Sequence, residues 1–142
     1  MIRKYDIFIG YSQKDWELAL EIVSKLTRAG FNCFLARKCL SAGKKWQDGL
    51  REAIKCSEQV LLIMTPNSRD SKWVIFEAGA AWGLEKPIIP ALLFVKPDEL
   101  MDCIREHQTY DIKCESGKME LIEALEKSKY LMGEKEDWPE AS

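Results

Sequence analysis

Hydrophobic positions along the chain switch repeatedly between strand spacing and helix spacing. Five short apolar runs predict strands, at residues 5–10, 31–35, 59–64, 87–94 and 108–112. Between them, apolar residues recur every three or four positions and predict helices at about 15–29, 46–56 and 72–84. A helical turn is expected within 97–106, and Leu121, Ile122 and Leu125 mark a last helix. This alternation is typical of one parallel sheet with helices on both faces.

Residues with special backbone preferences mark the ends of these elements. Gly10 ends the first strand, Ser12 and Asp15 can cap the first helix, and Gly30 stands where that helix stops. Asp70 or Ser71 is expected to cap the third helix. Pro90 has no amide hydrogen to donate, so we expect the fourth strand to be only partly paired.

The length and the apolar runs indicate a single domain. A chain of 142 residues can bury one core, and we place the domain at residues 1–132 and a polar C-terminal tail at 133–142. No apolar run approaches the ~20 residues that span a bilayer. The first strand begins almost at Met1, which leaves no room for a signal peptide. We therefore expect a cytoplasmic protein without a membrane partner.

Charge and cysteine usage exclude several classes. A net charge of −2 argues against nucleic-acid binding. Residues 1–45 hold nine Lys/Arg against four Asp/Glu, which would attract an anionic small molecule or form ordinary solvated surface. The five cysteines lack paired spacing and His107 is the single histidine, so we expect reduced thiols and no metal site.

The fold class locates the site. We predict an α/β, flavodoxin-like three-layer sandwich with five parallel strands in the order 2-1-3-4-5. Ligands bind such sheets beyond the carboxyl ends of the strands, where the strand order reverses. The loops gathered there are residues 10–14, 36–45 and 65–72. The chain has no glycine-rich phosphate loop and no carboxylate at the strand ends for phosphoryl transfer.

Glu77 is the most informative residue. A spacing of four places Trp73 and Glu77 on one face of the third helix, beside the loop after the third strand. Apolar neighbours indicate that this helix packs closely on the sheet, where a charge is costly unless it is paired or faces a pocket. The alternative is a solvated glutamate that pairs with Lys72 or Lys86.

Three segments in order resemble TIR (Toll/interleukin-1 receptor) domains. Residues 5–12 (YDIFIGYS) resemble the family's opening strand, with Gly10 in place of the usual serine. Residues 30–35 and 40–46 resemble its second strand and BB loop, although the usual Asp is replaced by Ala36-Arg37-Lys38. Residues 71–77 match the W-x-x-x-E pattern of the NAD-cleaving members. The resemblance covers residues 4–130 and is greatest to prokaryotic members.

The resemblance implies a role for Glu77 and for the residues around it. The matching glutamate is catalytic: it can oppose the positive charge that develops on ribose as nicotinamide leaves, and no general acid is required because nicotinamide leaves as a neutral molecule. Some of the other positions also have purely structural explanations, such as helix capping or core packing. The implied substrate-binding residues are Tyr11, Ser12, Arg37, Leu40, Gly43, Lys45, Trp46, Ser71 and Trp73.

The resemblance thus implies an NAD⁺ nucleosidase that releases nicotinamide and leaves ADP-ribose or a cyclic isomer. NAD⁺ is then a substrate, and no cofactor is expected. The expected setting is immune or anti-phage signalling, with self-association through TIR–TIR contacts and a partner effector that senses the product. Two alternatives stay open: a non-catalytic TIR adaptor, and an enzyme like the nucleoside deoxyribosyltransferases.

Overall fold

The computed structural model describes residues 5–35, 46–105 and 107–136 and contains one five-stranded sheet. The strands lie in the order β2-β1-β3-β4-β5, and every neighbouring pair is parallel. The predicted sheet and its strand order are therefore confirmed. The strands are β1 (Tyr5–Gly10), β2 (Cys33–Leu35), β3 (Ser57–Met64), β4 (Ile88–Leu92) and β5 (Tyr110–Asp111).

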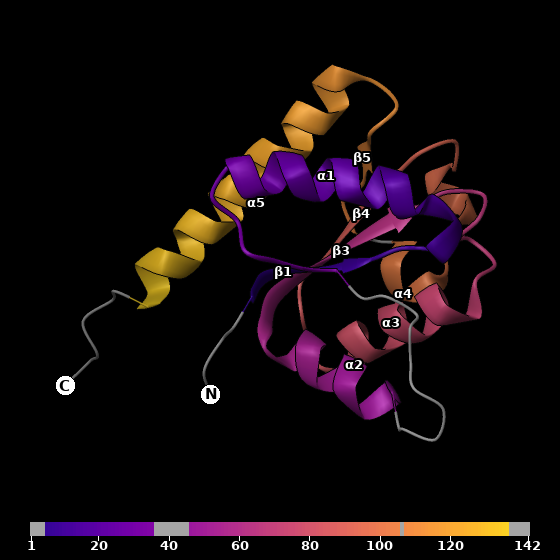
Figure 1. Cartoon of the computed structure of the whole chain (residues 1–142), viewed down its shortest axis with the longest axis horizontal. Coiled ribbons are helices and arrows are strands. Elements are labelled where there is room, and N and C mark those ends of the chain that lie inside the picture. Colours follow the sequence, from indigo (N-terminus) through magenta and orange to yellow (C-terminus); the bar gives the residue numbers. More distant parts are fainter. Residues whose placement is uncertain (1–4, 36–45, 106, 137–142) are drawn as a thin grey trace.

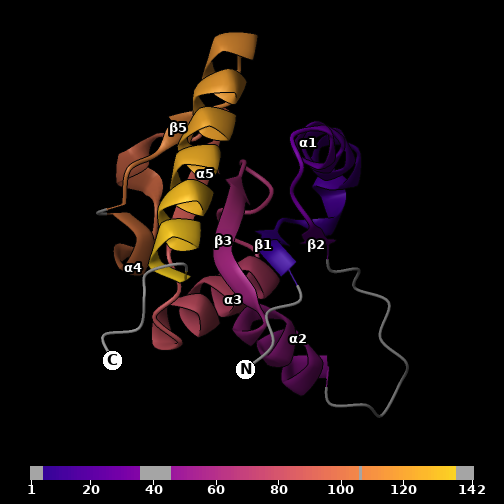
Figure 2. The same cartoon turned by 90° about the vertical axis from the view of Figure 1, so that its left-hand side faces the viewer.

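Helices cover both faces of the sheet (Figure 1). On one face lie α1 and α5, and on the other lie α2, α3 and α4. The turned view shows α1 and α2 on opposite sides of β1 (Figure 2). Two short 3₁₀ turns, η1 and η2, precede α1 and α4. The helical elements are η1 (Gln13–Asp15), α1 (Trp16–Arg28), α2 (Trp46–Lys55), α3 (Lys72–Gly83), η2 (Pro97–Glu99), α4 (Asp102–Arg105) and α5 (Glu115–Glu136).

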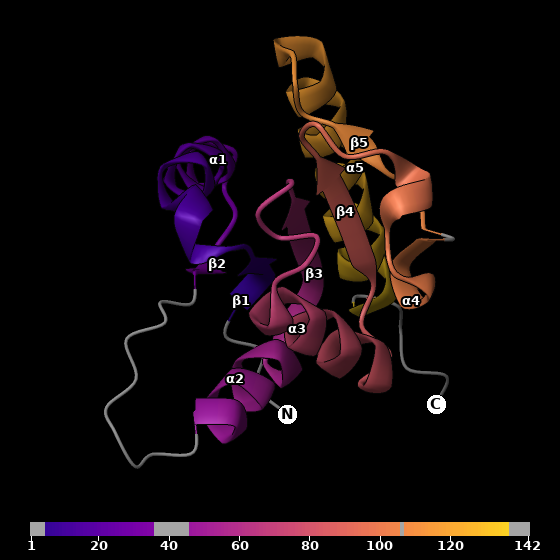
Figure 3. The same cartoon turned by 90° about the vertical axis from the view of Figure 1, so that its right-hand side faces the viewer.

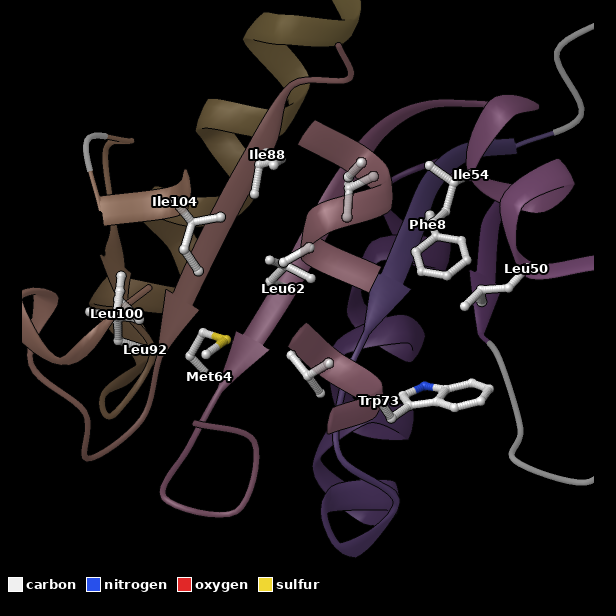
Figure 4. Close-up of a cluster of buried hydrophobic side chains, with 14 of the residues drawn as sticks. Phe8, Leu50, Ile54, Leu62, Met64, Trp73, Ile88, Leu92, Leu100 and Ile104 are labelled. Carbon is white, nitrogen blue, oxygen red and sulfur yellow. The ribbon is translucent and has the colours of Figure 1, made fainter. Parts of the chain in front are cut away.

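Each face of the sheet carries its own hydrophobic core, because alternate residues of a strand point to opposite faces. In β1, Ile7 and Ile9 pack under α1 and α5, whereas Phe8 packs under α2 and α3. Strand β3 behaves in the same way and is buried on both faces, as its continuous apolar run predicts. Figure 4 shows the core on the α2–α3 side.

The ends of the helices follow the predicted caps, with one exception. Ser71 caps α3 by accepting a hydrogen bond from the Val74 amide, and Ser12 caps η1. Gly30, with φ of 93°, ends α1. Asp15 occupies the cap position of α1, but its side chain makes no capping hydrogen bond and contacts the loop after β3 instead.

Several elements differ from the prediction at their ends or in their pairing. Strand β2 begins at Cys33 because the Phe31 amide donates to the Leu26 carbonyl and so belongs to the turn that ends α1. Strand β4 lies inside the sheet and pairs with β3 at five positions, Pro90 included, while only Ala91 and Leu92 pair with β5 (Figure 3). Helix α5 continues to Glu136, past residue 132, after which we placed the polar tail.

No helix within the described ranges is both long and apolar enough to cross a bilayer.

Candidate functional site

Glu77 lies on the sheet-facing side of α3 and has no exposed surface. Within the described ranges it is the only charged residue among those classed as buried. Neither carboxyl oxygen has a hydrogen-bond partner in the part of the chain that the structure describes. Buried acids that serve the fold are normally paired. The expected alternative, a solvated glutamate paired with a lysine, does not describe this side chain.

The carboxyl group of Glu77 packs against the last residue of β1. A Cβ atom built on Gly10 would lie 3.5 Å from Glu77 Oε1 and 3.7 Å from Glu77 Cδ. The same atom would lie 2.5 Å from Leu62 Cδ2, too close for an ordinary contact. The carboxyl group therefore faces bare backbone at the carboxyl end of the sheet, between β1 and α3.

Burial governs the electrostatics of this group. Loss of water around the carboxyl raises the pKa of Glu77 well above its ordinary value of 4.5, and no neighbouring charge contributes. The group is therefore shifted towards its protonated form. In such a low-dielectric place a carboxylate interacts with a nearby cation much more strongly than it would in water. The site is suited to a positively charged ligand or transition state.

A pocket opens one helical turn away from Glu77, at the carboxyl ends of β1 and β3. Its volume is about 470 Å³, within the usual range for small-molecule sites. Two of the three loops predicted to form the site, residues 10–14 and 65–72, supply nearly all of its walls. The lining residues are Ser12, Gln13, Lys14, Pro66, Asn67, Asp70, Ser71 and Trp73.

Trp73 joins the pocket to the buried acid. It lies four residues before Glu77 on the same face of α3 and lines the pocket. Its side chain is 9% exposed and belongs to the hydrophobic core with Phe8 and Leu50, at one end of the cluster in Figure 4. Trp73 is therefore both a core residue and part of the pocket wall.

A hydrogen-bond network ties the two pocket walls together. The Asp15 carboxylate accepts a hydrogen bond from Thr65 Oγ1 at 2.6 Å and another from Asn67 Nδ2 at 2.8 Å. Thr65 Oγ1 in turn accepts from the Asn67 amide, and the Thr65 amide donates to Ser68 Oγ. Asp15 directly follows the wall formed by Ser12, Gln13 and Lys14, so it holds the loop after β3 against the start of α1.

The predicted binding residues are distributed unevenly around this pocket. Ser12, Ser71 and Trp73 line it. Tyr11 is fully buried in the core under α1, with its ring centroid 5.9 Å from that of Trp16, and it does not line the pocket. Trp46 is the first residue of α2. The remaining four, Arg37, Leu40, Gly43 and Lys45, lie outside the described residues.

Several pocket residues were predicted only through the loops that carry them. Gln13, Lys14, Asn67 and Asp70 line the pocket, and nothing in their spacing distinguishes them from ordinary loop residues. The position of Tyr11, in contrast, had a signal in the sequence. It continues the odd-numbered positions of β1, which face α1, whereas Gly10 continues the even-numbered positions, which face α3.

Comparison with known sequences identifies relatives. The family model described as "TIR domain" matches residues 7–128. The stimulator of interferon genes protein of Magallana gigas is 34% identical over 74 residues, which are 51% of this chain and 18% of that protein. A probable 2′ cyclic ADP-D-ribose synthase of Brachypodium distachyon is 25% identical over 100 residues, 69% of this chain and 45% of that protein. The chain thus spans less than half the length of either relative.

Solved structures show the same fold. A metazoan TIR-STING receptor from C. gigas, in complex with 2′,3′-cGAMP, superposes with a TM-score of 0.72 and 28% identity over 85% of this chain and 39% of that one. The TIR domain of a Toll-related receptor from Hydra magnipapillata gives a TM-score of 0.69 and 22% identity over 87% and 99% of the two chains. From the family match over residues 7–128 and this common fold, we conclude that the chain belongs to the TIR domain family.

Proposed function

We propose that this chain is an NAD⁺ nucleosidase that breaks the bond between nicotinamide and ribose, with Glu77 as the catalytic residue. The observation that carries the proposal is the buried, unpartnered carboxyl group one helical turn from a pocket of about 470 Å³. Its burial is costly, and neither carboxyl oxygen makes a hydrogen bond with a described residue. A cationic substrate would give the carboxylate the partner that it lacks.

The chemistry follows from the charges. The bond between C1′ of ribose and the ring nitrogen breaks, its electron pair goes to nicotinamide, and positive charge develops on the ribose. A carboxylate in a dry site lowers the energy of that charge. Water then forms the new bond to C1′ and loses a proton to solvent, which leaves ADP-ribose. If a hydroxyl of the same molecule attacks instead, a cyclic product results.

Substrate must reach Glu77, whose side chain is fully covered in this conformation. Trp73 lines the pocket on one side and packs one helical turn before Glu77 on the other. We propose that nicotinamide mononucleotide, the reacting half of NAD⁺, enters beside Trp73 and displaces covering side chains. Ser12 and Ser71 then stand at the pocket wall, and Lys14 offers a cation to the phosphates.

One relative supports the proposed class of product. The Brachypodium distachyon relative is described as a probable 2′ cyclic ADP-D-ribose synthase, which supports the same bond cleavage here, followed by hydrolysis or cyclisation. We propose that the product acts on an effector protein in immune signalling and that the chain works when self-associated through TIR–TIR contacts.

The test is nicotinamide release. Purified protein is incubated with NAD⁺, alone and concentrated with a crowding agent, and the products are identified by mass. Glu77→Gln should reduce turnover by a factor of about 100 or more, because it removes the charge that opposes the ribosyl cation. Glu123→Gln, an exposed glutamate on the opposite helical layer, is the matched control. Equal turnover by Glu77→Gln and wild type would exclude the proposed role.

A second candidate is a TIR domain that acts by binding alone. The observation in its favour is the outer face of α3, where Ile75, Phe76 and Trp82 are 45%, 38% and 63% exposed. In this case the protein self-associates, NAD⁺ stays intact at every concentration, and substitution of Trp82 rather than Glu77 abolishes the association. Turnover of a deoxynucleoside with NAD⁺ untouched would instead favour a deoxyribosyltransferase.

A further inference from the structure

Gly10 and Glu77 meet between β1 and α3, at the carboxyl end of the sheet. The even-numbered positions of β1 face α3, so Phe8 fills the core there while Gly10, two residues later, offers no side chain. The space that a side chain would occupy is taken by Leu62 Cδ2 and by the carboxyl group of Glu77, whose Oε1 would lie 3.5 Å from a Cβ on Gly10.

The missing side chain has a chemical consequence. Residue 10 is the position on β1 from which a side chain would reach the Glu77 carboxyl, and glycine has nothing to donate. We propose that Gly10 is a positioning residue: it keeps hydrogen-bond donors away from Glu77, so that the carboxyl group holds its proton in the empty site and releases it when a cationic ligand arrives. The catalytic consequence rests on the proposed function; the protonation of the empty site does not.

Other charged groups do not account for the raised pKa of Glu77. Burial is the sole cause that raises its pKa, so no charge on a neighbouring element contributes. The described charged residues on its own helix and on the elements packed against it are Lys72 on α3, Asp6 on β1, Glu58 on β3, Arg51, Glu52 and Lys55 on α2, and Asp102 on α4.

Glu77 then forms a site that ionises when a cation binds. Without a ligand the protonated carboxyl of Glu77 is neutral, which lowers the desolvation cost of burying it. When a pyridinium-type cation binds nearby, the charged form is favoured and the proton leaves to solvent. The carboxylate is then present when positive charge moves onto the ribose. A donor at residue 10 would stabilise the carboxylate in the absence of ligand and remove this coupling.

Serine and alanine at residue 10 provide a matched test. Both add a Cβ atom that pushes equally on Leu62, but only serine adds a hydroxyl, which from that Cβ can reach Glu77 Oε1. Gly10→Ser should therefore lower the pKa of Glu77, and Gly10→Ala should not. The pKa is measured without substrate, from free energies of unfolding across pH for each protein with and without Glu77→Gln. For each protein, the free energy of unfolding with Glu77 is subtracted from that with Glu77→Gln, and this difference rises with pH until Glu77 is ionised in the folded state. The pH at which the difference stops rising should be about one unit lower with serine at residue 10 than with alanine.

The outcomes are distinct. Equal pH dependence for Gly10→Ser and Gly10→Ala would overturn the inference. If either variant fails to fold, the comparison is repeated in Leu62→Val, which removes the atom nearest to the new Cβ. If NAD⁺ is turned over, the acidic limb of the rate profile should move to lower pH in Gly10→Ser alone. A chain that never consumes NAD⁺ would refute the proposed function, while the unfolding data would still decide the role of Gly10.

Discussion

Replacement of Glu77 by glutamine should change the stability of the protein in a way that depends on pH. The amide has nearly the same shape as the protonated acid, but it does not titrate. Because burial raises the pKa of Glu77 in the folded state above 4.5, the folded protein binds more protons than the unfolded chain in this range. Stability from this group is therefore complete below about pH 4.5 and falls as pH rises towards the pKa of the folded side chain.

The magnitude follows from the linkage relation. One protonation site contributes about 1.4 kcal/mol per pH unit between the two pKa values. The difference in free energy of unfolding between Glu77→Gln and wild type should grow by that amount for each unit, in favour of glutamine. For a domain with a total stability of roughly 5–15 kcal/mol, this is a large change. It corresponds to a shift of about 5 °C in Tm per pH unit.

Urea unfolding followed by tryptophan fluorescence at pH 5, 6, 7 and 8 measures this difference. Any fixed cost of placing an amide in the site shifts all points equally and leaves the slope unchanged. Glu123→Gln, where the glutamate is exposed, should give a flat line. Parallel stability curves for Glu77→Gln and wild type would mean that the carboxyl is already ionised and solvated, and the case for a dry site would fail.

Two further predictions concern the walls of the pocket. Trp73→Ala should cost about 3–5 kcal/mol of stability, since Trp73 anchors the core. Trp73→Phe should cost less stability and should raise KM for NAD⁺ with little change in kcat. An unchanged KM would leave Trp73 with a packing role only. Asp15→Ala should cost about 1.5–3 kcal/mol, because the part-buried hydrogen bond from Thr65 to a charged group is lost, while the exposed bond from Asn67 adds little. The Asn67 and Ser68 amides should then exchange faster with deuterium, whereas unchanged exchange would show that Asp15 does not hold the loop.

The elements were predictable because their signals are local. Apolar spacing located β3 and α3, and turn residues such as Ser71 and Gly30 fixed helix ends, since each acts within a few residues of itself. The contact of Asp15 with Thr65 joins residues 50 positions apart, and no pattern along the chain encodes it. The interior place of Pro90 in β4 likewise depends on which neighbours pair there.

For the site too, local features were predictable and contacts between distant residues were not. Helical spacing predicted that Trp73 and Glu77 share a buried face, and topology predicted which loops meet; the pocket confirms two of those loops. The alternation of β1 could have predicted that Tyr11 lies in the core under α1, together with Ile7 and Ile9. It did not, because we predict the strand to end at Gly10 and Tyr11 to belong to the following loop. That Gly10 contacts Glu77 required the packing distance between β1 and α3, which the sequence does not contain.

Substitution of Glu77 can distinguish a role in stabilising the fold from a role in catalysis. An acid that stabilised the fold would have a partner, and its removal would leave that partner buried and unsatisfied. Among the described residues Glu77 has none, so glutamine in its place should leave the fold intact and more stable at neutral pH. Loss of NAD⁺ cleavage together with such a gain in stability would identify a residue retained for chemistry. Loss of both would instead indicate that Glu77 holds the structure together.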